Sequence, residues 1–261
     1  MSAFSFLAAY ASQVAAAIRA AFSDRLNFAL QAGGMAVNNG FFLTLWFLFF
    51  AGFRRVGGWG LADVGLLLGL GMMIVGLSGV FFGGYRDMAA TILRGELDTL
   101  LTQPGSLLAR LLARESHASG WGDLATGLIM LVVVAKLDLA STPLVIAALA
   151  AGLTVYVSAG VAFASLAFWI AGARSFARDL TDFTLLFSSY PGSVYSGATK
   201  LIAYSLLPAG FIVLAPVRLL RAPSVETAAV VVASAGAYAA LAAALFAAGL
   251  RRYRQGAAAI A

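Results

Sequence analysis

The side chains able to do chemistry are few in this sequence, and the most suggestive pair is Glu115 and His117. They stand two residues apart in the stretch Arg-Glu-Ser-His, and the chain holds no other histidine and no cysteine. A structural or catalytic zinc needs three or four nitrogen, sulfur or carboxylate ligands. The pair is therefore better explained as polar residues beside an apolar segment, and the sequence predicts no metal site.

Catalytic motifs are also missing. No phosphate-binding loop of the form G-x-x-x-x-G-K-[S/T] occurs, and the two lysines, Lys136 and Lys200, stand in other contexts. The chain is therefore not expected to hydrolyse ATP. Asp63 and Asp123 fall near the ends of apolar segments. Charges within membrane spans mark ion or proton pathways, so their scarcity argues against a proton-coupled pump or a channel with a charged filter.

The composition is that of a membrane protein. The chain of 261 residues is 62% hydrophobic and 11% charged, whereas soluble domains carry about 25% charged residues. Its 17 basic residues outnumber 11 acidic ones, and they cluster at the ends of apolar runs, as the positive-inside rule describes. No basic patch interleaved with aromatic residues occurs, so no nucleic-acid partner is expected.

Several apolar stretches have the length of about 20 residues that a spanning helix needs. They predict spans at residues 28–52, 61–83, 119–136, 143–171 and 225–250. A helical pattern precedes them at 4–22, with Gln13 and Arg19 off its apolar stripe. We expect this first helix to lie in the membrane interface, with an ordinary buried helix as the alternative.

One further span lies in the proline-broken region 173–222, which allows two interpretations. In the first, 180–200 crosses the membrane and a re-entrant hairpin follows at 201–222. In the second, 173–199 stays at the surface and 201–221 crosses. Broken backbone at membrane depth is tolerated only where protein or water covers it. Both interpretations predict an all-α polytopic protein with six transmembrane helices.

The orientation follows from the basic residues. Most of the 17 fall on one side if both termini are cytoplasmic, although Arg54 and Arg55 oppose this assignment. We therefore expect a bacterial inner-membrane protein with cytoplasmic termini and with lipids around it. Small residues four apart could also let helices approach closely; they are Gly65, Gly69, Gly79, Gly83, Gly236 and Ala240.

The longest charged interval, 84–118, contains the most informative segment. Residues 86–103 predict an amphipathic helix that ends at Pro104, with leucines on one face and Arg94 and Asp98 away from it. Such a helix suits docking to a soluble partner. A membrane-surface helix with a solvated charged face is the alternative.

Two motifs resemble a known family. Arg94-Gly-Glu-Leu-Asp98, followed by two leucines and Pro104, resembles the R-x-E-L-D-x-x-L-x-x-P segment of ABC-2 type permeases. Tyr190-Pro191-Gly-Ser-Val-Tyr195 resembles the Y-P-x-S-I-Y region of a six-span family within that group. The resemblance covers most of the chain. The sequence departs from the family pattern at Thr102-Gln103 and at Gly192 and Gly197.

The resemblance implies a permease subunit of an ATP-binding cassette exporter that pairs with a second copy or a related permease. ATP and magnesium would then be bound by cytoplasmic ATPase subunits, with no cofactor in this chain. The implied ATPase contact is Leu93, Arg94, Gly95, Glu96, Leu97, Asp98, Leu101 and Pro104. The implied path or gate region is Tyr190, Pro191 and Tyr195.

The cargo cannot be identified from the sequence, although charge-poor spans favour an apolar or amphipathic molecule. We expect the second and fifth spans to line its path. A transporter or channel that needs no ATPase is the main alternative. An intramembrane enzyme acting on lipids would need a polar cluster at the membrane surface, and only Glu115 and His117 offer one.

Overall fold

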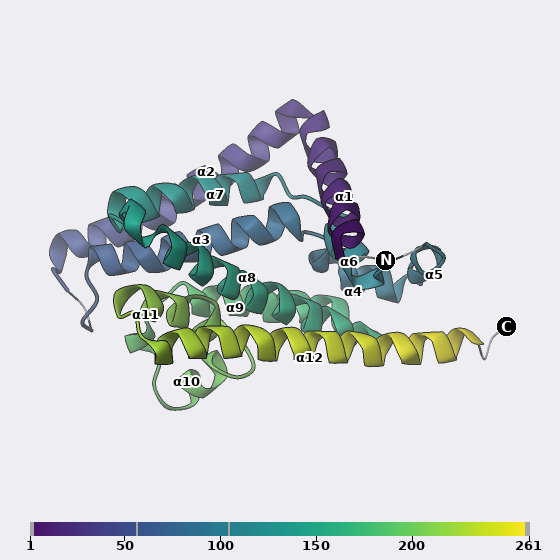
Figure 1. The fold of residues 1–261 in the computed structure, drawn as a ribbon. Helices are drawn as coiled ribbons and strands as arrows, with labels where there is room; N and C mark the ends of the chain where they lie inside the picture. Colours follow the sequence, from purple (N-terminus) through teal and green to yellow (C-terminus); the bar gives the residue numbers. More distant parts are fainter. Residues whose placement is uncertain (1–2, 56, 104, 259–261) are drawn as a thin grey trace.

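A computed structural model describes residues 3–55, 57–103 and 105–258, and all regular structure in these residues is helical. The long helices run along one another in an elongated bundle (Figure 1). They are α2 (Arg25–Gly52), α3 (Leu61–Phe81), α7 (Ser119–Ile129), α8 (Thr142–Ser165), α9 (Ala173–Ser188) and α12 (Val225–Ala258).

Helices occupy the ranges in which most spans were expected. In the described residues, 5 helices are long and apolar enough to cross a membrane: Ser5–Ser23, Arg25–Gly52, Leu61–Phe81, Leu139–Phe168 and Val225–Gln255. The expected span at 119–136 is shorter. It consists of α7 and a π-helical turn, η1 (Met130–Val134), which together form the apolar helix Ser119–Val134.

The first helix, α1 (Ala3–Ser23), lies across one end of the bundle rather than along it (Figure 1). The Tyr10 hydroxyl donates to the carbonyl oxygen of Phe81 at 2.9 Å, which ties α1 to the end of α3. This direction is the one expected of an interfacial helix, although Ser5–Ser23 also has the length and composition of a span.

Helices α3 and α7 pack in close contact because glycines face each other. A Cβ added at Gly76 would lie 2.8 Å from the carbonyl oxygen of Gly120, and one at Gly127 would lie 2.9 Å from the amide nitrogen of Met73. Gly65 faces Val134 in the same contact. Small residues allow such backbone approach.

The other small residues predicted for helix packing have varied surroundings. Gly69 faces Leu131 of η1, and Gly83 faces the Glu115 carbonyl oxygen. Gly79 has the looser neighbours Arg86, Gly120 and His117 at 3.8 Å. On α12, Gly236 has nothing within 4 Å of an added Cβ, and Ala240 is exposed.

The region 173–222 is broken into short helices, so neither 180–200 nor 201–221 is one continuous helix. After α9 come η4 (Gly192–Val194), α10 (Gly197–Ala203), the π turn η5 (Gly210–Leu214) and α11 (Ala215–Arg221).

Its contacts trace a hairpin. Ser193 meets Gly57 in the loop between α2 and α3, and Ser205 accepts a hydrogen bond from Tyr238 within α12. Arg221 then returns to the first end, where it pairs with Asp63 at 3.1 Å. The chain therefore enters the bundle after α9 and leaves by the same end.

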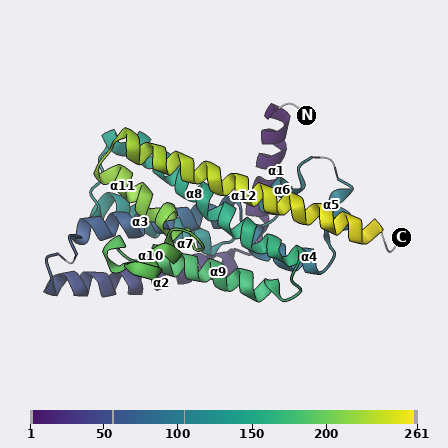
Figure 2. The same cartoon turned by 90° about the horizontal axis from the view of Figure 1, so that it is seen from below.

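Helix α12 is longer than expected. The predicted span ended at residue 250, before Arg251 and Arg252, but the helix continues to Ala258. Figure 2 shows α12 lying along α8 and extending past the rest of the bundle. Both termini lie at this end (Figure 1).

Candidate functional site

Three short helices connect α3 to α7 at the end of the bundle where the termini lie (Figure 1). They are α4 (Tyr85–Leu93), α5 (Leu97–Leu101) and α6 (Leu107–Ala113), and we call residues 84–118 the α4–α6 segment. Its base is fully buried, since Met88, Leu97 and Leu111 are each at most 1% exposed and belong to the main apolar core. The segment is thus anchored in the bundle.

Gly84 brings α4 and α6 together. Its amide nitrogen donates to the carbonyl oxygen of Leu112 at 3.2 Å, and a Cβ at this position would overlap the carbonyl oxygen of Leu111. Only glycine allows this approach, so the two helices are held as one unit.

The single amphipathic helix expected over 86–103 is interrupted at Gly95, which is a correction to the sequence analysis. Gly95 has φ +71°, and its amide nitrogen donates to Ile92 while that of Glu96 donates to Thr91. These bonds form the Schellman motif that ends a helix at a left-handed glycine. The sequence analysis did not predict this turn because apolar residues recur at helical spacing on both sides of Gly95.

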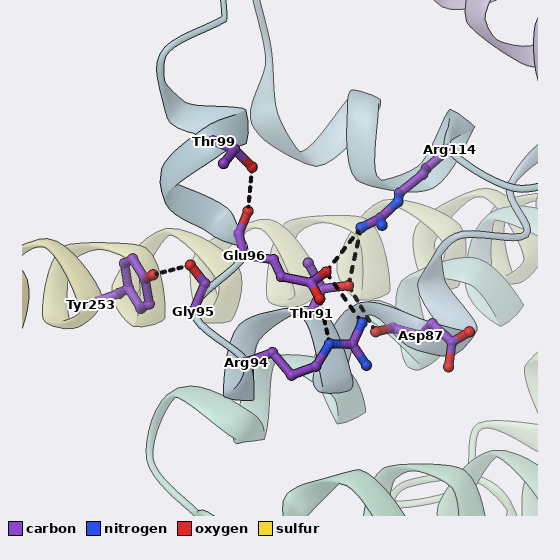
Figure 3. A network of polar contacts seen from close by, with 8 residues as sticks. All are labelled: Asp87, Thr91, Arg94, Gly95, Glu96, Thr99, Arg114 and Tyr253. Atoms are coloured by element: carbon purple, nitrogen blue, oxygen red, sulfur yellow. Dashed lines mark hydrogen bonds and ion pairs between the residues drawn. The ribbon is translucent and has the colours of Figure 1, made fainter.

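The charged residues of the turn form a small network (Figure 3). The Arg94 guanidinium donates to both carboxylate oxygens of Glu96, with Nη2 3.2 Å from Oε2, and Arg114 lies 3.6 Å from the same oxygen. The Arg94 hydrogen bond lowers the pKa of Glu96 below its usual range. Solvent screens these charges, so the network orients the turn more than it stabilises the fold.

The predicted contact residues divide by exposure. Leu93, Arg94, Gly95 and Asp98 face solvent, whereas Leu97 is buried. Glu96 and Leu101 are half-buried, and Pro104 lies outside the described residues. An exposed charged turn therefore rests on a buried apolar base.

Helix α12 contributes a residue to this site that the sequence analysis missed. The Tyr253 hydroxyl donates to the carbonyl oxygen of Gly95 at 3.1 Å, although the two are 158 positions apart (Figure 3). Burial and the nearby carboxylate of Asp98 raise the pKa of Tyr253. The sequence analysis ended the last span at residue 250 because basic residues follow it, and so it did not predict that α12 continues as a helix to Tyr253.

His117 has a structural position at the end of the α4–α6 segment. Its amide nitrogen donates to the carbonyl oxygen of Gly79 at 2.9 Å, and Nε2 lies 3.2 Å from that of Gly83. Burial, and then the nearby charge of Arg86, lower the pKa of the imidazole. The described residues contain no group of side chains suited to a metal ion.

Tyr190, Pro191 and Tyr195 lie at the opposite end of α9. The Tyr195 hydroxyl donates to the carbonyl oxygen of Phe187, and their rings stack with centroids 5.5 Å apart. Tyr190 contacts Trp46 of α2, and Pro191 is buried. These residues close the end of α9 where the hairpin begins.

A cleft runs beside α3, between α2 and α9. It consists of two cavities of about 380 Å³ and about 370 Å³, and both are lined by Met35, Val75, Asp123 and Leu185. The first, which we call the polar cavity, reaches the α4–α6 segment; the second, the apolar cavity, extends toward η5. Both lie along the second and fifth expected spans.

A buried polar contact lies where the two cavities meet. The Asn39 side-chain amide donates to Asp123 Oδ1 at 2.8 Å and to Thr126 Oγ1 at 2.9 Å. Asp123 is 5% exposed. No local pattern predicts contacts between residues 84 positions apart, so the sequence analysis placed Asp123 only at a span end.

Comparison with known proteins gives one match. The model of a family described as "ABC-2 family transporter protein" matches residues 36–257. No curated protein and no solved structure matches the chain.

Proposed function

Because this chain belongs to the ABC-2 transporter family, we propose that it is the membrane-spanning subunit of an ATP-driven exporter. ATP and magnesium are bound and used by separate cytoplasmic subunits. One observation carries the proposal: the exposed charged turn at Arg94–Asp98 rests on a buried base that belongs to the core of the bundle.

This arrangement suits the transmission of force. A partner that binds Arg94, Glu96 and Asp98 can displace α4 and α5. The apolar faces of these two helices pack in the same core as α3 and α8. Protein cores are close-packed and transmit displacement rather than absorbing it. A movement at the turn is therefore expected to reach the cleft beside α3.

Transport would follow from two arrangements of paired subunits. ATP binding by the partner favours one arrangement and its release favours the other, since a ligand shifts a two-state equilibrium by its differential affinity. The second subunit is another copy or a related permease. The cleft between α3 and α9 is the path, and Tyr190, Pro191 and Tyr195 lie at its far end as the proposed gate.

The docking role is tested by reversing charge at the turn. We expect Glu96→Lys with Asp98→Lys to abolish substrate-stimulated ATPase activity of the purified complex while the chain remains folded. Asp138→Lys with Glu226→Lys is the matched control, because both carboxylates are exposed and lie outside the turn. Intact stimulation in the first variant would contradict the docking role. Failure of any ATPase subunit to copurify with the unaltered chain would favour an ATP-independent transporter or channel.

The orientation is tested by labelling, since the chain has no cysteine. Thr102 and Val225 are exposed and belong to opposite ends of the bundle. In intact cells, an impermeant thiol reagent should modify Val225→Cys and spare Thr102→Cys until the membrane is opened. The reverse pattern would place the α4–α6 segment outside.

A further inference from the structure

The polar cavity contains a cation without an ionic partner. Arg86 of α4 is largely buried, and no carboxylate of the described chain lies within ion-pair distance of it. Its guanidinium carbon lies 6.0 Å from the centre of the Tyr85 ring. A cation in a cavity of about 380 Å³ is placed to meet something that enters it.

Two buried tyrosines line the same cavity. Tyr85 and Tyr156 are each 2% exposed, and neither hydroxyl oxygen has a hydrogen-bonding partner in the part of the chain that the structure describes. Both hydroxyl oxygens are closed off by protein, so the two tyrosines form the wall of the cavity beside Arg86 and leave the guanidinium as its cationic group.

The cavity also holds an anion. Asp123 accepts a hydrogen bond from Asn39, but no cation of the described chain lies within ion-pair distance of it. Arg86 and Asp123 are close enough for their charges to interact. Asp87, by contrast, is paired with Arg178 at 3.2 Å, and Asp182 is exposed.

We propose that the polar cavity binds the zwitterionic group of an amphipathic cargo. The anionic group of the cargo, a phosphate or a carboxylate, bonds to Arg86. Its ammonium group bonds to Asp123. The apolar part extends into the adjoining apolar cavity, which Phe42, Leu68 and Ile212 help to line.

Simpler cargoes fit less well. An anion alone would face Asp123, a cation alone would face Arg86, and an apolar molecule would leave both charges unpaired. The volume is also suitable, because small-molecule sites usually measure about 300–1,000 Å³. The term cargo rests on the proposed function, but the binding itself does not.

The test is a thermal shift on the purified chain in a neutral maltoside detergent, with no ATPase subunit present. Three probes share a 12-carbon tail: lysophosphatidylethanolamine, dodecyl phosphate and dodecylamine. We expect the zwitterionic probe to raise the Tm at concentrations about tenfold lower than either singly charged probe, the ratio for one hydrogen bond to a charged group. Equal responses to all three would overturn the proposal.

Variants locate the site. Arg86→Gln and Asp123→Asn should each remove the preference for the zwitterion, and Arg86→Lys should retain it. Tyr238→Phe, outside the cavity, is the control and should leave the preference unchanged. If Asp123→Asn does not fold, the contrast between Arg86→Gln and Arg86→Lys decides, and an unchanged preference in Arg86→Gln contradicts the site.

Two soluble probes separate the sources of a zwitterion. Glycerophosphoethanolamine has the lipid head group without a tail, and leucine has a carboxylate in place of the phosphate. A response to the first supports a lipid, and a response to the second supports a soluble amino compound. The assay needs neither ATP nor transport, so a failure of the ATPase proposal leaves its result unaffected.

Discussion

The α3–α7 contact and the turn between α4 and α5 both depend on glycine, for opposite physical reasons. At Gly76 the backbone is ordinary helix, but there is no room for a side chain, because a Cβ would lie 2.8 Å from the Gly120 carbonyl oxygen. At Gly95 space is available, since only the Tyr253 hydroxyl lies within 4 Å of an added Cβ, at 3.8 Å. There the constraint is φ +71°.

The difference separates the frame of the molecule from its proposed contact surface. Close backbone approach makes α3 and α7 a rigid pair along the bundle. The turn is exposed and polar, and it is held by a few hydrogen bonds that solvent can replace. A partner acting on the turn can therefore change its geometry without separating the helices beneath it.

The largest effect is expected in the frame. Gly76→Ala must push α3 from α7, and overpacking of this kind costs about 1–3 kcal/mol. Gly71→Ala is the matched control on the same helix, because its Cβ would meet only Val213 at 3.8 Å. It should be neutral or stabilising, since alanine is the better helix former by about 1 kcal/mol. Thermal unfolding followed by tryptophan fluorescence measures both, and equal Tm values would refute the close-contact account.

The next effect concerns the turn. Gly95→Ala places an L residue in the left-handed region, which costs about 1–2 kcal/mol, but it creates no clash. We expect ATPase stimulation to fall, and the Tm to decrease by only a few degrees. Gly105→Ala, at φ +102° with nothing within 4 Å, introduces similar strain outside the network. If both variants lose stimulation equally, the Arg94–Glu96 turn has no special role.

A smaller effect is expected from Tyr253→Phe, which removes the hydrogen bond to Gly95. Such a bond contributes about 0.5–1.5 kcal/mol, so trypsin cleavage after Arg94 should become about 2- to 10-fold faster. Tyr238→Phe removes a similar bond, to Ser205, elsewhere on α12 and should leave this rate unchanged. An unaltered rate in Tyr253→Phe would mean that α12 does not hold the turn.

The smallest effect lies at the junction of the two regions, where His117 contacts the end of α3. Its pKa is below the ordinary 6.5 because of burial and Arg86. The unfolded chain then takes up the proton first, so stability is complete above about pH 6.5 and decreases as the pH falls toward the folded pKa. The Tm of the unaltered chain should therefore decrease between about pH 7 and about pH 5.5, and that of His117→Gln should decrease less. Glu96 does not interfere, since its pKa lies below 4.5.

Much of the fold follows from hydropathy, because long apolar runs such as 61–83 can only be buried in a bilayer or a core. The breaks are harder to predict. Gly95 interrupts α4 and α5 although the leucine stripe continues through it, since a helix-period pattern does not report the φ of one glycine. The length of α12 was underestimated because Arg251 and Arg252 suit a solvated helix as well as a helix end.

The site was predicted only where it is local in sequence. The Arg94–Asp98 motif lies in one turn and could be recognised. Asn39 with Asp123, and Tyr253 with Gly95, unite distant segments through the packing of whole helices. Arg86 has the sequence context of a surface residue, and only the fold places it in a cavity.

The length of α12 has a mechanical consequence. Its 34 residues extend about 51 Å at 1.5 Å per residue, whereas the hydrocarbon core of a bilayer is about 30 Å thick. This one continuous helix thus contacts Ser205 of the hairpin near its middle, through Tyr238, and the Gly95 turn near its end, through Tyr253. Any tilt of α12 must move both contacts together, so the Gly95 turn and the hairpin are mechanically coupled through a single helix.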